Sequence, residues 1–124
     1  MRILIADDHT LFRRGFSLLL QRLYPDSEIE EASDVVSALE VVQRTAIDLL
    51  LLDLGMPGME GLSGLEQLRD AVPSAAIVIV SAISDSDRIR EALERGARGY
   101  VLKTINDAAL KHALSLVLSG ETYV

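Results

Sequence analysis

Short apolar segments alternate with longer segments of helical periodicity along the whole chain, and this alternation constrains the fold more than any other feature. Four almost entirely apolar runs occupy residues 3–6, 47–52, 75–80 and 100–102. Runs of this length indicate strands that are buried on both faces of a sheet. Residues 28–32 are more polar, as expected of an edge strand with fewer buried positions.

The segments between these runs carry apolar residues three and four positions apart, the period of an amphipathic helix. The pattern predicts five helices: Phe12 to Leu23; Val35, Leu39 and Val42 behind a cap at Ser33 or Asp34; Leu62 to Val72, stopped by Pro73; Ser86 to Arg95; and Leu110 to Val117 between a cap at Asn106 and a C′ glycine at Gly120. The fourth has only three apolar residues, so we expect it to be weakly held and movable.

A strand followed by a helix, repeated five times, predicts an α/β fold with a doubly wound parallel sheet and helices on both faces. A barrel of eight such units would need about twice the length. We therefore expect residues 1–124 to form one domain. The absence of Cys excludes a disulfide scaffold, a thiolate metal site and a Cys nucleophile.

Charge and hydropathy narrow the function classes. Twelve Lys and Arg residues against 19 Asp and Glu give a net charge of −7, which argues against nucleic-acid binding by this domain itself. No apolar run reaches the ~18 residues of a membrane span, and the N-terminal run is too short for a signal peptide. The sequence therefore predicts a cytoplasmic domain without a membrane segment.

Each central strand is followed by a polar residue of a type used in catalysis. Asp7 and Asp8 follow the first strand and Asp53 the third, whereas Ser81 and Lys103 follow the last two. Ligands of doubly wound sheets bind at the carboxyl ends of the strands, so these side chains are expected at one edge. One polar residue after a strand is ordinary, but residues of these types after all four strands together predict a site.

The residue types predict phosphoryl transfer onto an aspartate. Three converging carboxylates repel one another unless a cation lies among them, and an all-oxygen set suits Mg²⁺. Lys103 adds a positive charge of the kind that binds phosphoryl oxygens, and Ser81 adds a hydroxyl donor. The glycine-rich loop that follows Asp53 offers the Gly55 carbonyl as a further metal ligand. Together these groups indicate that the Asp53 carboxylate is the nucleophile.

These residues and their spacing resemble the response-regulator receiver domain, the phosphoacceptor half of two-component signalling, over the whole chain. Asp7-Asp8 resembles its acidic pair, Asp53 its phosphorylated aspartate and Lys103 its lysine, while Ser81 and Tyr100 match its switch residues. Within the family, the chain looks like the NarL/FixJ (LuxR-like) subfamily in Asp7-Asp8-His9, in Leu11, Arg14 and Gly15, and in the ending from Leu118 to Tyr123. Thr104 stands where many receivers outside this subfamily carry Pro.

The resemblance implies a flavodoxin-like, CheY-like (βα)5 fold with strand order 2-1-3-4-5. It implies Mg²⁺ bound by Asp8, Asp53 and the Gly55 carbonyl, with Asp7 binding directly or through water. A sensor histidine kinase would be the phosphodonor. The domain would be no conventional enzyme, although it would assist its own phosphorylation and dephosphorylation.

The resemblance also implies an output. When Ser81 moves toward the phosphoryl group, Tyr100 is expected to rotate inward, and residues 86–95 and 99–102 are expected to respond. In this subfamily a helix-turn-helix DNA-binding domain usually follows the receiver, so we expect control of transcription through such a domain in the full-length protein. Homodimerisation on phosphorylation is a further expectation, and the sequence does not indicate its surface.

Three alternatives share parts of this pattern. A pseudo-receiver would dock partners without phosphate, but such domains typically lack one of the acidic pair, the acceptor or the lysine. A phosphatase of the haloacid-dehalogenase kind needs an Asp two residues after its nucleophile, where this chain has Gly55. A flavodoxin-like flavin carrier needs a Ser/Thr-rich phosphate loop after the first strand, and no such loop follows Ala6.

Of the two histidines, His9 is expected to flank the first helix and face water, and His112 to lie on the polar side of the last helix.

Overall fold

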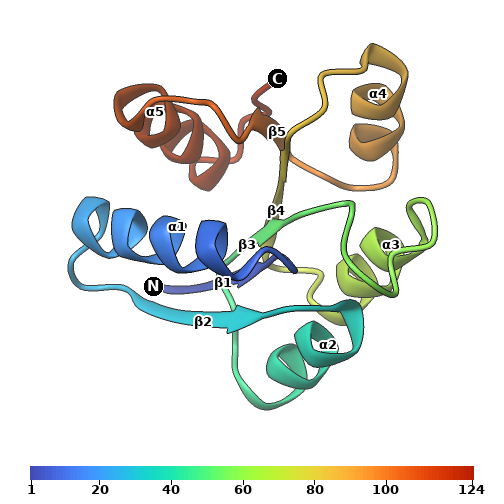
Figure 1. Cartoon of the computed structure of the whole chain (residues 1–124), viewed down its shortest axis with the longest axis horizontal. Coiled ribbons are helices and arrows are strands. Elements are labelled where there is room, and N and C mark those ends of the chain that lie inside the picture. The colour runs from blue at the N-terminus through green and yellow to red at the C-terminus, as the bar shows by residue number, and fades with distance from the viewer.

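The computed structural model describes residues 1–124 and contains five strands, each followed by a helix. The elements are β1 (Arg2–Ala6), α1 (Thr10–Leu23), β2 (Glu28–Ala32), α2 (Val35–Arg44), β3 (Leu49–Leu52), α3 (Ser63–Ala71), β4 (Ala76–Ser81), α4 (Ser86–Glu94), β5 (Gly99–Leu102) and α5 (Asp107–Leu118). All strand pairs are parallel, in the order β2-β1-β3-β4-β5 (Figure 1). The predicted fold class and strand order are confirmed.

Helices cover both faces of the sheet. Helices α1 and α5 lie on one side, and α2, α3 and α4 lie on the other (Figure 1). Alternate residues of a strand enter opposite cores, because successive side chains of a strand point to opposite faces. In β1, Ile3 and Ile5 pack with α1 and α5, whereas Leu4 and Ala6 pack with the three other helices. The continuous apolar runs therefore belong to strands buried on both sides, as predicted. None of the helices has the length and hydrophobicity needed to cross a bilayer.

Strand β3 begins at Leu49, two residues later than the predicted start at Ile47. Asp48 interrupts the apolar run: it is exposed, and its carboxylate accepts a hydrogen bond from the Arg2 amide at 2.8 Å. Ile47 remains part of the core, since it is buried in the cluster that includes α2 and α3. The apolar run thus indicated burial correctly and the strand boundary incorrectly.

Helix α2 turns a different stripe to the core than predicted. Val35 is buried as expected, but Ala38 and Val41 are the other fully buried residues, while Leu39 and Val42 are partly exposed. A 3.6-residue period allows either stripe, and close approach of the helix to the sheet favours the smaller Ala38. Of the two candidate caps, Asp34 is the one used; its carboxylate accepts from the Ser37 amide at 2.7 Å.

Helix α4 is weakly anchored, as predicted, because Ala92 is its only fully buried residue. Beyond α5, the chain passes Gly120 in a left-handed conformation (φ 97°) and returns to the free edge of β5. There the Tyr100 amide donates to the Tyr123 carbonyl at 3.0 Å, and the Tyr123 amide donates to the Arg98 carbonyl at 3.0 Å. The last residues of the chain therefore extend the sheet beside β5.

A glycine fixes the loop that follows β3. Gly58 has φ 90°, and a Cβ at this position would lie 2.9 Å from the Cβ of Val35. We expect Gly58→Ala to lower the free energy of unfolding by about 2 kcal/mol, because it adds both backbone strain and a clash. Gly15 is the control: a Cβ there meets nothing within 4 Å, and Gly15→Ala in helix α1 should stabilise by about 0.5–1 kcal/mol. Denaturant unfolding of both variants measures the difference. A Gly58→Ala protein as stable as wild type would contradict this account of the loop.

Candidate functional site

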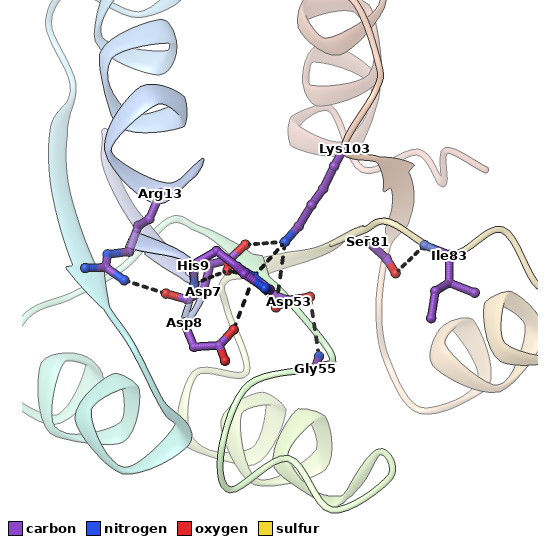
Figure 2. Close-up of polar contacts among 9 residues, drawn as sticks. All are labelled: Asp7, Asp8, His9, Arg13, Asp53, Gly55, Ser81, Ile83 and Lys103. Carbon is purple, nitrogen blue, oxygen red and sulfur yellow. Dashed lines mark hydrogen bonds and ion pairs between the residues drawn. The ribbon is translucent and has the colours of Figure 1, made fainter. Parts of the chain in front are cut away.

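The carboxyl ends of β1, β3 and β5 bring the predicted side chains together at one edge of the sheet (Figure 2). Ala6 pairs with Leu52, so Asp7 and Asp53 leave neighbouring strands at the same level. Ser81 pairs with Leu102, which places Lys103 one residue beyond the end of the adjacent strand. Parallel register is therefore sufficient to gather the acidic pair, Asp53 and Lys103.

Asp7 is the most firmly held of the three carboxylates. Its side chain is 3% exposed, and its Oδ2 lies 2.8 Å from Lys103 Nζ. Its Oδ1 accepts from the His9 amide at 2.8 Å. The backbone carbonyl of Asp7 accepts from Arg13 Nη1 at 2.6 Å, and Arg13 Nε donates to Glu31 at 2.8 Å. Arg13 therefore holds the β1–α1 turn against β2, a positioning role that the sequence analysis missed.

Asp53 is buried and incompletely paired. Its side chain is 8% exposed, and its Oδ1 accepts from the Gly55 amide at 3.3 Å. Its buried Oδ2 has no hydrogen-bond partner; Lys103 Nζ lies 3.8 Å away. Burial raises the pKa of Asp53 above its ordinary value, and the nearby Asp7 charge raises it further, whereas Lys103 opposes both effects. This carboxylate has an oxygen available for a cation or an electrophile.

His9 also belongs to the site. The residue precedes α1 and its side chain is 66% exposed, as expected of a group facing water. Its Nδ1 nevertheless lies 3.0 Å from Asp7 Oδ1, 3.3 Å from Asp8 Oδ1 and 3.4 Å from Lys103 Nζ (Figure 2). The expectation that His9 only flanks the helix was therefore incomplete. Its position directly after the acidic pair was the one available signal.

The donor set fits a divalent cation. Single ligand atoms of Asp7, Asp8, His9 and Asp53 lie within 4.8 Å of one another. The unpartnered Oδ2 of Asp53 would cost about 1–3 kcal/mol if it stayed unsatisfied, and a cation would remove that cost. The Gly55 carbonyl accepts no hydrogen bond from the protein and so remains available as a ligand. Carboxylate and carbonyl oxygens are the ligands that Mg²⁺ prefers.

Ser81 and Tyr100 meet at Ile83 in the loop between β4 and α4. The buried Ser81 Oγ accepts from the Ile83 amide at 3.1 Å, and the Tyr100 hydroxyl donates to the Ile83 carbonyl at 2.8 Å. Tyr100 is 4% exposed, so its ring already lies inside. In this conformation the ring packs in the core and its hydroxyl has a partner there, so the inward rotation expected on phosphorylation stays a prediction.

Comparisons with known proteins agree with this site and fold. Residues 3–115 match the response regulator receiver domain family. The glycerol metabolism activator of Pseudomonas putida is 41% identical over 124 residues, which are 99% of this chain and 56% of that protein. The chain thus spans little more than half the length of this relative.

Two solved structures are similar over nearly their whole length. A LuxR family DNA-binding response regulator from Silicibacter pomeroyi has a TM-score of 0.87 and 35% identity, covering all of this chain and 96% of that one. The receiver domain of the response regulator NarL from Mycobacterium tuberculosis has a TM-score of 0.85 and 30% identity, covering 97% of each chain. On the family match, these likenesses and the gathered Asp and Lys residues, the chain belongs to the response regulator receiver domain family, in its NarL/LuxR-type branch.

Proposed function

We propose that Asp53 is the phosphoacceptor of this receiver domain. An Asp53 carboxylate oxygen forms a bond to phosphorus while the bond from phosphorus to the donor breaks. The electron pair of the broken bond goes to the donor atom, which is a kinase histidine nitrogen or the leaving oxygen of a small phosphodonor. The observation that carries this proposal is the buried Asp53 Oδ2, which has no protein hydrogen bond and has Lys103 Nζ 3.8 Å away. The Asp7 and Asp8 carboxylates have closer partners, Lys103 Nζ at 2.8 Å and His9 Nδ1 at 3.3 Å respectively.

The acidic residues would hold Mg²⁺ beside this acceptor. Asp8, Asp53 and the Gly55 carbonyl would bind the cation, and Asp7 would bind it directly or through water. When bound, the cation supplies positive charge that offsets the charge of the transferring phosphoryl group. Support comes from the clustering of the carboxylate oxygens and from the free Gly55 carbonyl.

Lys103 and Ser81 would bind the phosphoryl oxygens. A phosphoryl group adds about −1.5 to −2 charges at neutral pH, which need cationic and hydrogen-bonding partners. Lys103 carries three N–H donors, and its Nζ already lies between Asp7 and Asp53. Ser81 Oγ accepts one hydrogen bond and donates none, so its hydroxyl proton is available to the phosphoryl group. The domain would in this way assist its own phosphorylation and dephosphorylation.

The loop at Ile83 would transmit the conformational change caused by phosphorylation to α4 and β5. If Ser81 turns its hydroxyl toward a phosphoryl group, the Ile83 amide changes partners, and the same residue holds the Tyr100 hydroxyl through its carbonyl. The weakly anchored α4 begins three residues later. Phosphorylation would therefore alter the β4–α4 loop, α4 and β5, a local electrostatic event that shifts a two-state element.

Tyr100→Phe tests this coupling. The variant keeps the buried ring and loses the hydrogen bond to Ile83, which is worth about 1 kcal/mol. We expect Asp53 to be phosphorylated at a rate within about threefold of wild type, since the Tyr100 hydroxyl bonds to Ile83 and not to Asp53 or Lys103. Amide hydrogen exchange of residues 83–95 should respond much less to phosphorylation than in wild type. Tyr123→Phe is the control, because Tyr123 lies beside Tyr100 and bonds to it through the backbone only. An unchanged response in Tyr100→Phe would exclude this route.

We propose that a sensor histidine kinase is the physiological donor and that the full-length protein works in the cytoplasm. A C-terminal helix-turn-helix domain would bind DNA, and phosphorylation would control transcription through it, with homodimerisation as part of the output. Support comes from the LuxR-type relatives and from the length of the P. putida relative, of which this chain spans 56%. The receiver itself, with net charge −7, would not bind DNA.

The mass of the intact protein after incubation with acetyl phosphate and Mg²⁺ tests the proposal. We expect one added phosphoryl group in wild type, and none in Asp53→Asn or after chelation of Mg²⁺. Asp26→Asn is the matched control, because Asp26 is exposed and makes no hydrogen bond or ion pair. If wild type gains no group from acetyl phosphate or from a kinase, the domain signals without phosphate as a pseudo-receiver.

A further inference from the structure

The imidazole of His9 lies among the three carboxylates, and the phosphoryl transfer proposed above does not use it. Its Nδ1 lies 3.0 Å from Asp7 Oδ1, 3.3 Å from Asp8 Oδ1 and 3.9 Å from Asp53 Oδ2. One nitrogen and three oxygens from four side chains therefore form a single compact donor set. A second observation points to a ligand here, because the buried Asp53 Oδ2 has no protein partner.

These separations match those between ligands that share one cation. With metal–ligand bonds of about 2.1–2.2 Å, neighbouring ligands of an octahedral ion lie about 3.0 Å apart and opposite ligands about 4.3 Å apart. The three nitrogen–oxygen separations, 3.0, 3.3 and 3.9 Å, fall inside that range. A cation among the carboxylates could therefore contact Nδ1 with little movement of the ring.

The hydrogen-bond partners of His9 lie in the same cluster. The 3.0 Å contact of Nδ1 with Asp7 Oδ1 needs a proton on Nδ1, because a carboxylate oxygen only accepts. The 3.4 Å contact with Lys103 Nζ needs an Nδ1 lone pair instead, because an ammonium group only donates, so Nδ1 satisfies one of the two contacts at a time. A cation among the carboxylates would take the Nδ1 lone pair, with the ring proton on Nε2. The ring makes no capping hydrogen bond to α1 that this would break.

We infer that His9 is a ligand of the cation at this site and that its nitrogen shifts selectivity from Mg²⁺ toward a transition-metal ion such as Mn²⁺. The inference builds on the proposed function, because it concerns the same cation, and it adds the class of metal. Oxygen ligands alone suit Mg²⁺, Ca²⁺ and Mn²⁺, whereas imidazole is a ligand typical of transition metals. Mn²⁺ accepts both donor types.

Pulsed electron paramagnetic resonance of bound Mn²⁺ tests the ligand directly, because it detects the coupling to a coordinated ¹⁴N nucleus. Wild-type chain, His9→Ala and the control His112→Ala are compared; His112 is the other histidine and is exposed on α5. We expect the nitrogen coupling in wild type and in His112→Ala, and its loss in His9→Ala. The dissociation constant for Mn²⁺ should rise about tenfold in His9→Ala. That for Mg²⁺ should change less than about twofold, since oxygen ligands suffice for Mg²⁺.

Bound Mn²⁺ without nitrogen coupling in wild type would overturn the inference. So would an unchanged Mn²⁺ affinity in His9→Ala, or a tighter one, which would mean that the ring blocks the site. Asp53→Asn separates this result from the proposed function. Binding of both ions that falls in Asp53→Asn but not in His9→Ala leaves the acceptor site standing without His9. Failure of wild type to bind either ion would overturn both.

Discussion

Lys103→Met is expected to slow the phosphorylation of Asp53 by about 100-fold, the size of effect seen when one preorganised group that stabilises a transition state is removed. Lys103 is the cation nearest the acceptor, with Nζ 3.8 Å from Asp53 Oδ2. Met retains an apolar side chain that can keep packing against Phe12, whose ring centroid lies 4.6 Å from Nζ. The charge is therefore the main property removed. Phosphorylation by acetyl phosphate, followed by intact mass over time, gives the rate.

The same substitution should also destabilise the protein. Asp7 is 3% exposed and Lys103 is 15% exposed, so the 2.8 Å ion pair between them is largely buried. Removal of one partner of a buried pair costs about 3–5 kcal/mol, because the remaining charge stays buried without compensation. Mg²⁺ should recover part of this loss by supplying another cation. Lys111→Met, on the exposed side of α5, is the control and should change neither property. Wild-type phosphorylation rates in Lys103→Met would contradict the assigned role.

Asp53→Asn is expected to stabilise the metal-free protein by about 1–2 kcal/mol at neutral pH, because it removes a buried charge with one unpaired oxygen. The pKa of Asp53 is raised above its ordinary value of 3.8 by burial and by Asp7. The folded protein therefore holds this proton more tightly than the unfolded chain does. The stability of wild type relative to the variant falls as pH rises through the raised pKa.

The pH dependence supplies the check. Below the ordinary pKa of Asp53 the carboxyl is protonated in both states, so wild type and Asp53→Asn should converge in stability. Above the raised pKa the gap should be constant. Mg²⁺ should narrow it, because it binds the folded wild type and stabilises it by mass action. Denaturant unfolding from pH 3.5 to 8 measures these differences, with Asp26→Asn as control. A less stable Asp53→Asn at neutral pH would show that the carboxylate is satisfied in the folded state.

Much of the site was predictable because parallel sheets gather strand ends. An apolar run indicates a strand, and the residue after it must lie at the carboxyl edge of the sheet, so Asp7, Asp53 and Lys103 could be assigned to one site without knowledge of any contact. The position of Asp53 is unaffected by the later start of β3, at Leu49 rather than Ile47. Strand ends, and not strand starts, determine which residues meet.

What the sequence could not predict depends on side-chain orientation and on contacts between distant residues. The ring of His9 could turn to water or to the carboxylates, and periodicity does not distinguish the two. Arg13 reaches Glu31, eighteen residues away, and no local pattern encodes that pair. The burial of Tyr100 depends on a carbonyl in another loop, that of Ile83. Each of these features follows from packing in three dimensions.

Borohydride reduction identifies the residue that carries the phosphoryl group. Borohydride converts an aspartyl phosphate, but not a free carboxylate or a phosphohistidine, to homoserine, which peptide mass mapping then locates. After treatment with acetyl phosphate and Mg²⁺, we expect homoserine at position 53 alone, and none in the untreated protein. Homoserine at Asp7 or Asp8, or a phosphorylated protein that yields no homoserine at all, would contradict the assignment of Asp53 as the acceptor.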